Sequence, residues 1–219
     1  FGGMGFSADT PMESAWRDAR ISRIYEGTNE INRMLAVGML VKKAMKGQVD
    51  LLGPATKVGE ELMGIPSFET PDFSELFAEE KDVLARLKKV FLMVAGGAVQ
   101  KYGPELENHQ QLMLSASDIL IEIYMAESTL LRTEKNAKRF GENAQATQIA
   151  MSKLYLYTAV DIIIQKGKEA IVSFAEGDEQ RMMLMGLKRF TKYTNQPNVV
   201  SLRTQIADQV AAANGYTFD

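Results

Sequence analysis

The chain has 219 residues, of which 46% are hydrophobic and 24% are charged, an ordinary balance for a globular protein. Lys and Arg total 25 and Asp and Glu total 28, and the resulting net charge of −3 argues against a nucleic-acid partner, which favours a clustered basic surface. Because the sequence has no cysteine and one histidine, it excludes a disulfide scaffold, a thiol nucleophile and a multi-histidine metal cage, and we predict no metal site.

The sequence opens on a stretch dense in glycine. Its first residue is Phe1 rather than methionine, and residues 1–6 read Phe-Gly-Gly-Met-Gly-Phe. A natural amino terminus rarely starts inside such a turn. We therefore expect the sequence to be a piece of a longer polypeptide.

Two helices are expected next. Pro11 follows Asp9 and Thr10, and a capping residue before a proline is typical of a helix start, so we predict a helix over 11–20. Thr28 or Asn29 can cap a second helix that ends near residue 47. Without covering helices from elsewhere, we expect the apolar face of that helix to self-associate, to dock onto the rest of the chain or to be disordered. That face holds Ile31, Met34, Leu35, Gly38 and Met45.

The pattern weakens between residues 48 and 72, where glycine and proline are frequent. These residues are Gly53, Pro54, Gly59, Gly64, Pro66 and Pro71. Such residues break helices and strands, so we predict a linker over 51–75 with room for one short helix. This divides the chain into an N-terminal part, residues 1–50, and a C-terminal domain, residues 76–219.

From residue 76 onward the apolar pattern is that of helices. One seam alternates spacings of four and three, and a second repeats every seven residues from Ile149 to Ala170, as in a helix bundle. The first seam comprises Leu112, Ala116, Ile119, Ile123, Ala126, Leu130, Thr133, Ala137 and Phe140. We also predict helices over 79–102, 179–194 and 199–213. The pair Gly96-Gly97 is expected to mark a close helix contact, since glycine weakens a helix. The predicted fold class is all-α, an up-and-down helical bundle.

Three short strings within residues 1–33 carry the specific functional signal. They are the Gly2-Gly3 turn, Arg17-Asp18-Ala19-Arg20-Ile21, and Glu26-Gly27-Thr28-Asn29-Glu30-Ile31. Taken one at a time they are weak. A glycine cluster is usually only a turn, and the strand that a dinucleotide-binding fold requires does not precede it. A glutamate just before a helix is usually a solvated carboxylate.

In this order and at this spacing, the three strings resemble the C-terminal signature of the acyl-CoA dehydrogenase family. The rest of the chain resembles, less specifically, the additional helical domain of the very-long-chain type. The resemblance implies that residues 1–50 end the catalytic helical domain, with two of its helices, and that residues 76–219 form an additional bundle. It implies an FAD-dependent enzyme that α,β-desaturates acyl-CoA thioesters.

The resemblance also assigns roles to eight residues. Glu26 matches the catalytic base, which removes the α-proton while a hydride leaves the β-carbon for FAD. A positioned base is required because the α-proton of a thioester is weakly acidic, and burial beside an apolar chain makes a carboxylate a stronger base. Gly27 matches a substrate-binding glycine. The positions that match FAD contacts are Phe1, Gly2, Gly3, Thr28, Asn29 and Glu30.

The partners implied by the resemblance are an acyl-CoA substrate, electron-transfer flavoprotein and further copies of the chain in a homo-oligomer. We expect the bacterial cytoplasm or the mitochondrial matrix as the compartment. No apolar run approaches the roughly 20 residues of a membrane-spanning helix. The chain also lacks a strongly basic amphipathic helix, so we expect no membrane contact.

Two alternatives stay open. An acyl-CoA oxidase shares the same base chemistry but lets oxygen reoxidise the flavin. In the other alternative, residues 76–219 are a non-catalytic interaction or assembly module, because they show no convergent acid–base or nucleophile set. In the family the flavin also contacts an N-terminal helical domain and a β-domain. We therefore expect the 219 residues alone to be inactive and to hold no FAD tightly.

Overall fold

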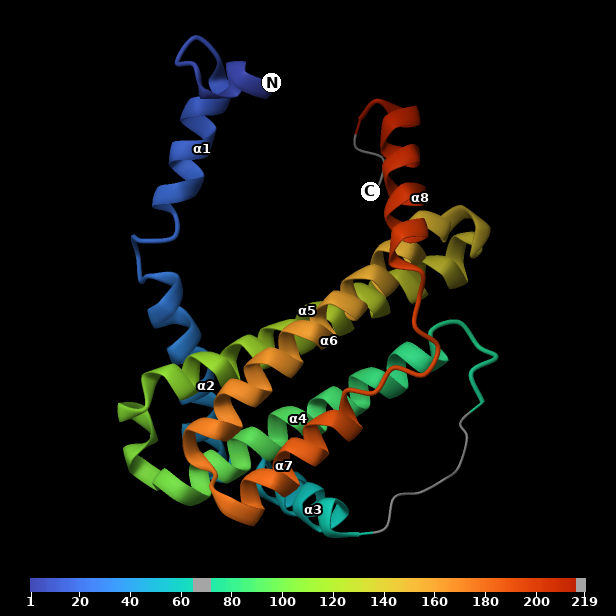
Figure 1. Ribbon diagram of the computed structural model, residues 1–219. Helices are drawn as coiled ribbons and strands as arrows, with labels where there is room; N and C mark the ends of the chain where they lie inside the picture. The colour runs from blue at the N-terminus through green and yellow to red at the C-terminus, as the bar shows by residue number, and fades with distance from the viewer. Residues whose placement is uncertain (65–71, 216–219) are drawn as a thin grey trace.

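The computed structural model describes residues 1–64 and 72–215, and every secondary-structure element in them is helical (Figure 1). The prediction of an all-α fold is therefore confirmed. The elements are η1 (Gly2–Phe6), α1 (Pro11–Ile21), α2 (Asn29–Met45), α3 (Leu52–Met63), α4 (Ala78–Tyr102), η2 (Gly103–Asn108), α5 (Gln110–Phe140), η3 (Asn143–Gln145), α6 (Ala146–Phe174), α7 (Gly177–Phe190) and α8 (Val199–Ala213). Pro66 and Pro71 of the predicted linker lie outside the described residues.

The two longest helices, α5 and α6, lie side by side and run in opposite directions (Figure 1). Helices α4 and α7 cover them on one side, and α8 rises from one end. The predicted α5 seam is buried from Leu112 to Ala137. Its last member, Phe140, is 55% exposed because it is the final residue of the helix. The periodicity thus identified the core-facing side of α5 correctly, apart from that end.

The glycine pair in α4 marks close contacts, as predicted. A Cβ on Gly96 would lie 3.0 Å from the Cβ of Ala55 in α3. A Cβ on Gly97 would lie 2.8 Å from Cε2 of Phe174, a buried ring at the end of α6. Neighbouring helices therefore approach α4 at a distance that only glycine permits.

Helix α7 ends four residues before the predicted boundary at 194. The chain beyond it is held by side chains of α4. Arg86 donates through Nη1 to the carbonyl oxygens of Phe190, at 3.3 Å, and of Lys192. The buried carboxylate of Glu79 accepts from the backbone N–H groups of Thr194, at 2.9 Å, and Asn195, at 2.7 Å. These bonds replace the helical hydrogen bonds that the predicted helix would have needed.

The predicted linker contains the short helix for which the sequence left room. Helix α3 packs on α4 and α7, and its Glu61 pairs with Lys89 at 2.7 Å and with Arg189 at 3.3 Å. The division of the chain at residues 51–75 remains a prediction. The structure adds that α3 is joined to the bundle by packing and by ion pairs.

Helix α2 docks onto α5, one of the three arrangements expected for it, and Met34 and Gly38 of the predicted face lie on the docked side. Val37 is 2% exposed, and a Cβ on Gly38 would lie 3.4 Å from Cε of Met113 in α5. Ile31 and Leu35 of the predicted face are instead more than half exposed. Further toward the amino terminus, η1 and α1 project away from the bundle, and neither contains a buried residue (Figure 1).

We predict that the substitution Gly97→Ala lowers the free energy of unfolding by about 1–3 kcal/mol, because a methyl group there overpacks the core against Phe174. The matched control is Gly59→Ala in α3, where no atom lies within 4 Å of an added Cβ. Alanine favours a helix over glycine, so the control is expected to raise stability by up to about 1 kcal/mol. Urea unfolding measures both, and equal effects of the two variants would contradict the close contact.

Candidate functional site

The candidate base lies in a sharp turn between α1 and α2. Glu26 has a φ of 57° and Gly27 a φ of 93°, so two consecutive residues adopt left-handed backbone. The backbone N–H of Asn29 donates to the carbonyl oxygen of Arg23 at 3.2 Å and closes the turn. A left-handed glutamate costs about 1–2 kcal/mol, and such strain clusters at functional sites. The turn leaves Glu26 exposed.

Gly27 is required both by its backbone angle and by its surroundings. A Cβ there would lie 2.9 Å from Oδ1 of Asn32. The Nδ2 group of Asn32 donates to the carbonyl oxygen of Gly27 at 2.9 Å. Asn32 lies just outside the three strings, although an asparagine in the first turn of a helix, next to a glycine turn, is a usable signal for such a bond. Asn32 thus fixes the turn from the side of α2.

Thr28 is the N-cap of α2, because its Oγ1 accepts the backbone N–H of Ile31 at 3.2 Å. Asn29 and Glu30 follow in the first helical turn and are exposed. A hydrogen bond to backbone N–H lowers the pKa of Glu30 by more than desolvation raises it, and the Thr28 side chain and the charges of Arg23 and Arg33 lower it further. Glu30 is therefore a carboxylate at neutral pH and accepts hydrogen bonds.

The glycine turn at the amino terminus forms the second group of candidate residues. The N–H of Met4 donates to the carbonyl oxygen of Phe1 at 3.1 Å, and Gly2 has a φ of 53°. No atom lies within 4 Å of a Cβ built on Gly2 or Gly3. The backbone of this turn is therefore open to close approach by another molecule.

The structure does not bring the two groups of candidate residues together. Residues 1–3 and residues 26–30 lie at opposite ends of α1 (Figure 1). At 1.5 Å per residue, the 11 residues of α1 span about 16 Å. Five of the eight candidates, Glu26 to Glu30, thus form one cluster, and Phe1, Gly2 and Gly3 form another.

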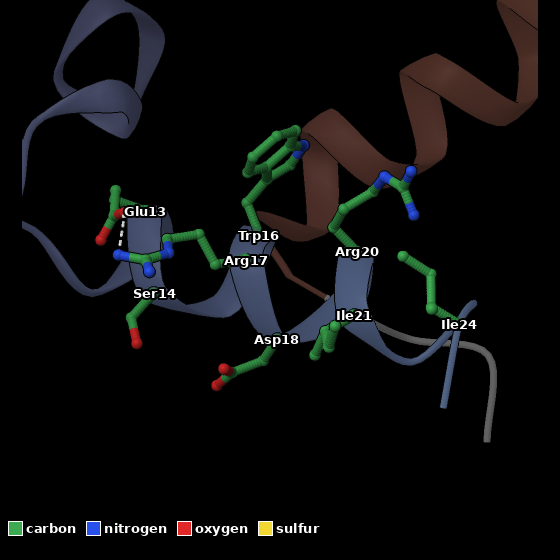
Figure 2. Close-up of a pocket in the computed structure, with 8 residues that line it drawn as sticks. All are labelled: Glu13, Ser14, Trp16, Arg17, Asp18, Arg20, Ile21 and Ile24. Carbon is green, nitrogen blue, oxygen red and sulfur yellow. Dashed lines mark hydrogen bonds and ion pairs between the residues drawn. The ribbon is translucent and has the colours of Figure 1, made fainter. Parts of the chain in front are cut away.

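An open hollow of about 460 Å³ runs along α1 and includes the Arg17-Asp18 string. Figure 2 shows Arg17 directed toward Glu13 rather than toward Asp18, and the Arg17–Glu13 distance is 3.4 Å. The exposed indole of Trp16 stands on the same helix. The hollow is lined by residues of α1 and the turn that follows it, so it is a surface feature with one wall.

Within residues 1–64 and 72–215, no group of three or more His, Cys, Asp or Glu side chains is arranged to hold a metal ion. None of the helices described there combines the length and the apolar character needed to cross a bilayer.

The known proteins that this chain resembles are described as acyl-CoA dehydrogenases. Two family models described as "Acyl-CoA dehydrogenase, C-terminal domain" match residues 1–39 and 86–189. A "Probable acyl-CoA dehydrogenase" of Bacillus subtilis is 37% identical over 99% of this chain and 36% of its own length. The mitochondrial short-chain specific acyl-CoA dehydrogenase of Bos taurus is 54% identical over 41 residues, which are 19% of this chain and 10% of that protein.

A solved structure extends the similarity to three dimensions. The crystal structure of an acyl-CoA dehydrogenase complexed with FAD from Bacillus anthracis superposes with a TM-score of 0.92 at 38% identity. The match covers 99% of this chain and 36% of that one. The chain thus spans little more than a third of the length of the two Bacillus proteins.

We predict that Thr28→Ala weakens the start of α2 by about 1 kcal/mol, because the N-cap hydrogen bond to Ile31 is lost. The amide hydrogen of Ile31 should then exchange about fivefold faster. Thr28→Ser keeps the hydroxyl and is the matched control. Equal exchange rates in the two variants, measured by hydrogen–deuterium exchange, would contradict the cap.

Proposed function

Because the chain belongs to the acyl-CoA dehydrogenase family, and to its C-terminal region, we propose that it is part of an enzyme that α,β-desaturates acyl-CoA thioesters. Glu26 is the proposed base. The observation that carries this proposal is the geometry of the turn: an exposed carboxylate on left-handed backbone, followed by a glycine at which a side chain would be strained.

In the proposed reaction, the carboxylate of Glu26 takes the α-proton of the bound thioester and becomes a carboxylic acid. In the described part of the chain, no hydrogen bond or ion pair ties this carboxylate to a neighbour, in contrast to Glu13, which pairs with Arg17. The carboxylate is therefore not engaged by another side chain of the described residues and is free to contact a bound substrate. A positioned general base contributes typically 10²–10⁴-fold to the rate.

Gly27 is proposed to contact the substrate. Since it has no side chain, a thioester can lie directly against the backbone of the turn. The bond from Asn32 to its carbonyl oxygen holds that backbone in place. Orientation of this kind contributes to catalysis by holding the α-carbon next to the base.

FAD is the proposed cofactor, and the residues of both clusters fit it in part. The open backbone at Gly2 and Gly3 allows close approach, and the first turn of α2 presents backbone N–H groups at the positive end of a helix dipole. Glu30 is ionised, so it suits a hydroxyl or N–H group of the cofactor rather than a phosphate. Phe1, Thr28 and Asn29 complete the proposed set. When bound, FAD would accept the hydride from the β-carbon.

The proposed partners follow from the family. Electron-transfer flavoprotein is the proposed electron acceptor, and the complete enzyme is proposed to be a homo-oligomer in the bacterial cytoplasm or the mitochondrial matrix. Both proposed compartments rest on the kinds of relative matched, a protein of Bacillus subtilis and a mitochondrial enzyme of Bos taurus.

We predict that Glu26→Gln in the complete enzyme lowers kcat by about 10²–10⁴-fold, because the amide cannot take the α-proton. Turnover is measured with an acyl-CoA substrate and an artificial electron acceptor, and exchange of the α-proton is followed in deuterated water. Glu142→Gln, at an exposed glutamate beyond α5, is the control for loss of one carboxylate. A Glu26→Gln enzyme with its FAD bound and unchanged turnover would end the assignment.

We further predict that the 219 residues alone neither retain FAD nor desaturate acyl-CoA. The physical reason is that α1, which is about 16 Å long, separates the two clusters and that both clusters face solvent. Flavin absorbance after gel filtration, with the complete enzyme as the positive control, measures retention. A yellow preparation of this region that turns over substrate would contradict the prediction.

A further inference from the structure

An ion pair joins the helix that follows the proposed base to the C-terminal bundle. Nη2 of Arg33, in α2, lies 2.5 Å from Oδ1 and 2.6 Å from Oδ2 of Asp118, in α5. Both side chains are mostly shielded, with 29% and 20% exposure. Nζ of Lys166, in α6, lies 4.0 Å from the same carboxylate and 2.8 Å from Glu169. Asp118 therefore connects three helices.

Arg33 lies one turn into α2, close to the proposed site. Its charge helps to lower the pKa of Glu30, so the two side chains are within electrostatic range. Nε of Arg33 is buried without a hydrogen-bond partner among the described residues, an arrangement that costs stability. The strong bonds from Nη2 to Asp118 offset that cost and hold the guanidinium in place.

Next to the ion pair, α2 and α5 also make an apolar contact. Val37 is buried one turn beyond Arg33, and the next residue, Gly38, lies against Met113 of α5. Met34, Leu40 and Val41 of α2 also pack against the core, so apolar contacts and the directional ion pair together hold α2 on the bundle. The Glu26 turn, which Asn32 and Thr28 tie to the first turn of α2, must move with that helix.

We propose that Asp118 is a positioning residue for the reaction. The ion pair of Asp118 with Arg33 holds α2 in position on the bundle. Because the turn that carries Glu26 is tied to α2, the ion pair also holds Glu26 in the position from which it takes the α-proton. The C-terminal bundle would then contribute to the geometry of the catalytic site and not only to assembly. This inference rests on the proposed role of Glu26.

The test uses the complete enzyme with FAD bound and the variants Asp118→Asn and Arg33→Gln. Misplacement of a catalytic group by about 1 Å can cost about 10²-fold. We therefore expect each variant to lower kcat about tenfold or more, with a parallel fall in the rate of α-proton exchange and little change in KM. The double variant should lose no more than the worse single variant, because both remove one interaction. Arg33→Lys, which keeps the charge, should recover part of the loss.

Glu134→Gln is the matched control. Glu134 is also a largely shielded carboxylate of α5, and it pairs across helices with Lys81 of α4 at 2.7 Å, but it does not contact α2. The variant Glu134→Gln should lower thermal stability about as much as Asp118→Asn does, but its rate of α-proton exchange should stay close to that of the wild type. This comparison separates positioning from a general loss of stability.

Two results would overturn the inference: unchanged α-proton exchange in a folded Asp118→Asn or Asp118→Glu enzyme, or equal losses in Glu134→Gln. If Asp118→Asn does not fold, Arg33→Lys and Asp118→Glu carry the test, and wild-type exchange in both would also overturn it. The failure of this inference is distinct from failure of the proposed function. The former leaves Glu26→Gln inactive, whereas the latter leaves Glu26→Gln active.

Discussion

The antiparallel packing of α5 against α6 supports the helices that lie directly on this pair, which are α2, α4, α7 and α8. Their facing sides are built from small and medium apolar residues at helical spacing, and burial of such surface stabilises a fold by about 25 cal/mol per Å². Helices α4 and α7 close the core over this pair, α8 packs on α6, and α2 packs on α5. Because α2 rests on α5, the candidate site at its amino terminus depends on a core whose own residues carry no candidate chemistry.

The sequence predicted the helices correctly where interactions between residues close in the chain determine the structure. Helical spacing located α5 and α6, and the cap at Thr28 located the start of α2. The prediction failed where a side chain far away in the sequence determines where a helix ends. Helix α7 stops early because Glu79, more than a hundred residues away, binds the backbone of Thr194 and Asn195. The docking face of α2 was predicted only in part. Met34 and Gly38 lie on the docked side, whereas Ile31 and Leu35 are exposed, because the contacts of α2 are with Met113 and Asp118 in α5.

The candidate site was predicted by motif and only partly by geometry. The three strings within residues 1–33 carried the family resemblance, and the left-handed backbone at Gly27 adds a physical reason for the glycine in the third of them. The separation of residues 1–3 from residues 26–30 by the length of α1 agrees with the helix predicted over 11–20, whereas the projection of α1 away from the bundle is seen only in the structure (Figure 1). Asn32 and Asp118 lay outside the motifs and became visible only through their contacts.

The backbone conformation of Glu26 has a consequence for which amino acids the position can accept. Left-handed backbone is adopted more readily by asparagine and aspartate than by glutamate. Aspartate would relax the main chain, yet its carboxylate would be withdrawn by one methylene group. The length of the side chain therefore favours glutamate at position 26, whereas the backbone conformation favours aspartate or asparagine. Glutamate at this position therefore keeps a strained main chain, and in return its carboxylate extends one methylene group farther from the backbone than that of aspartate.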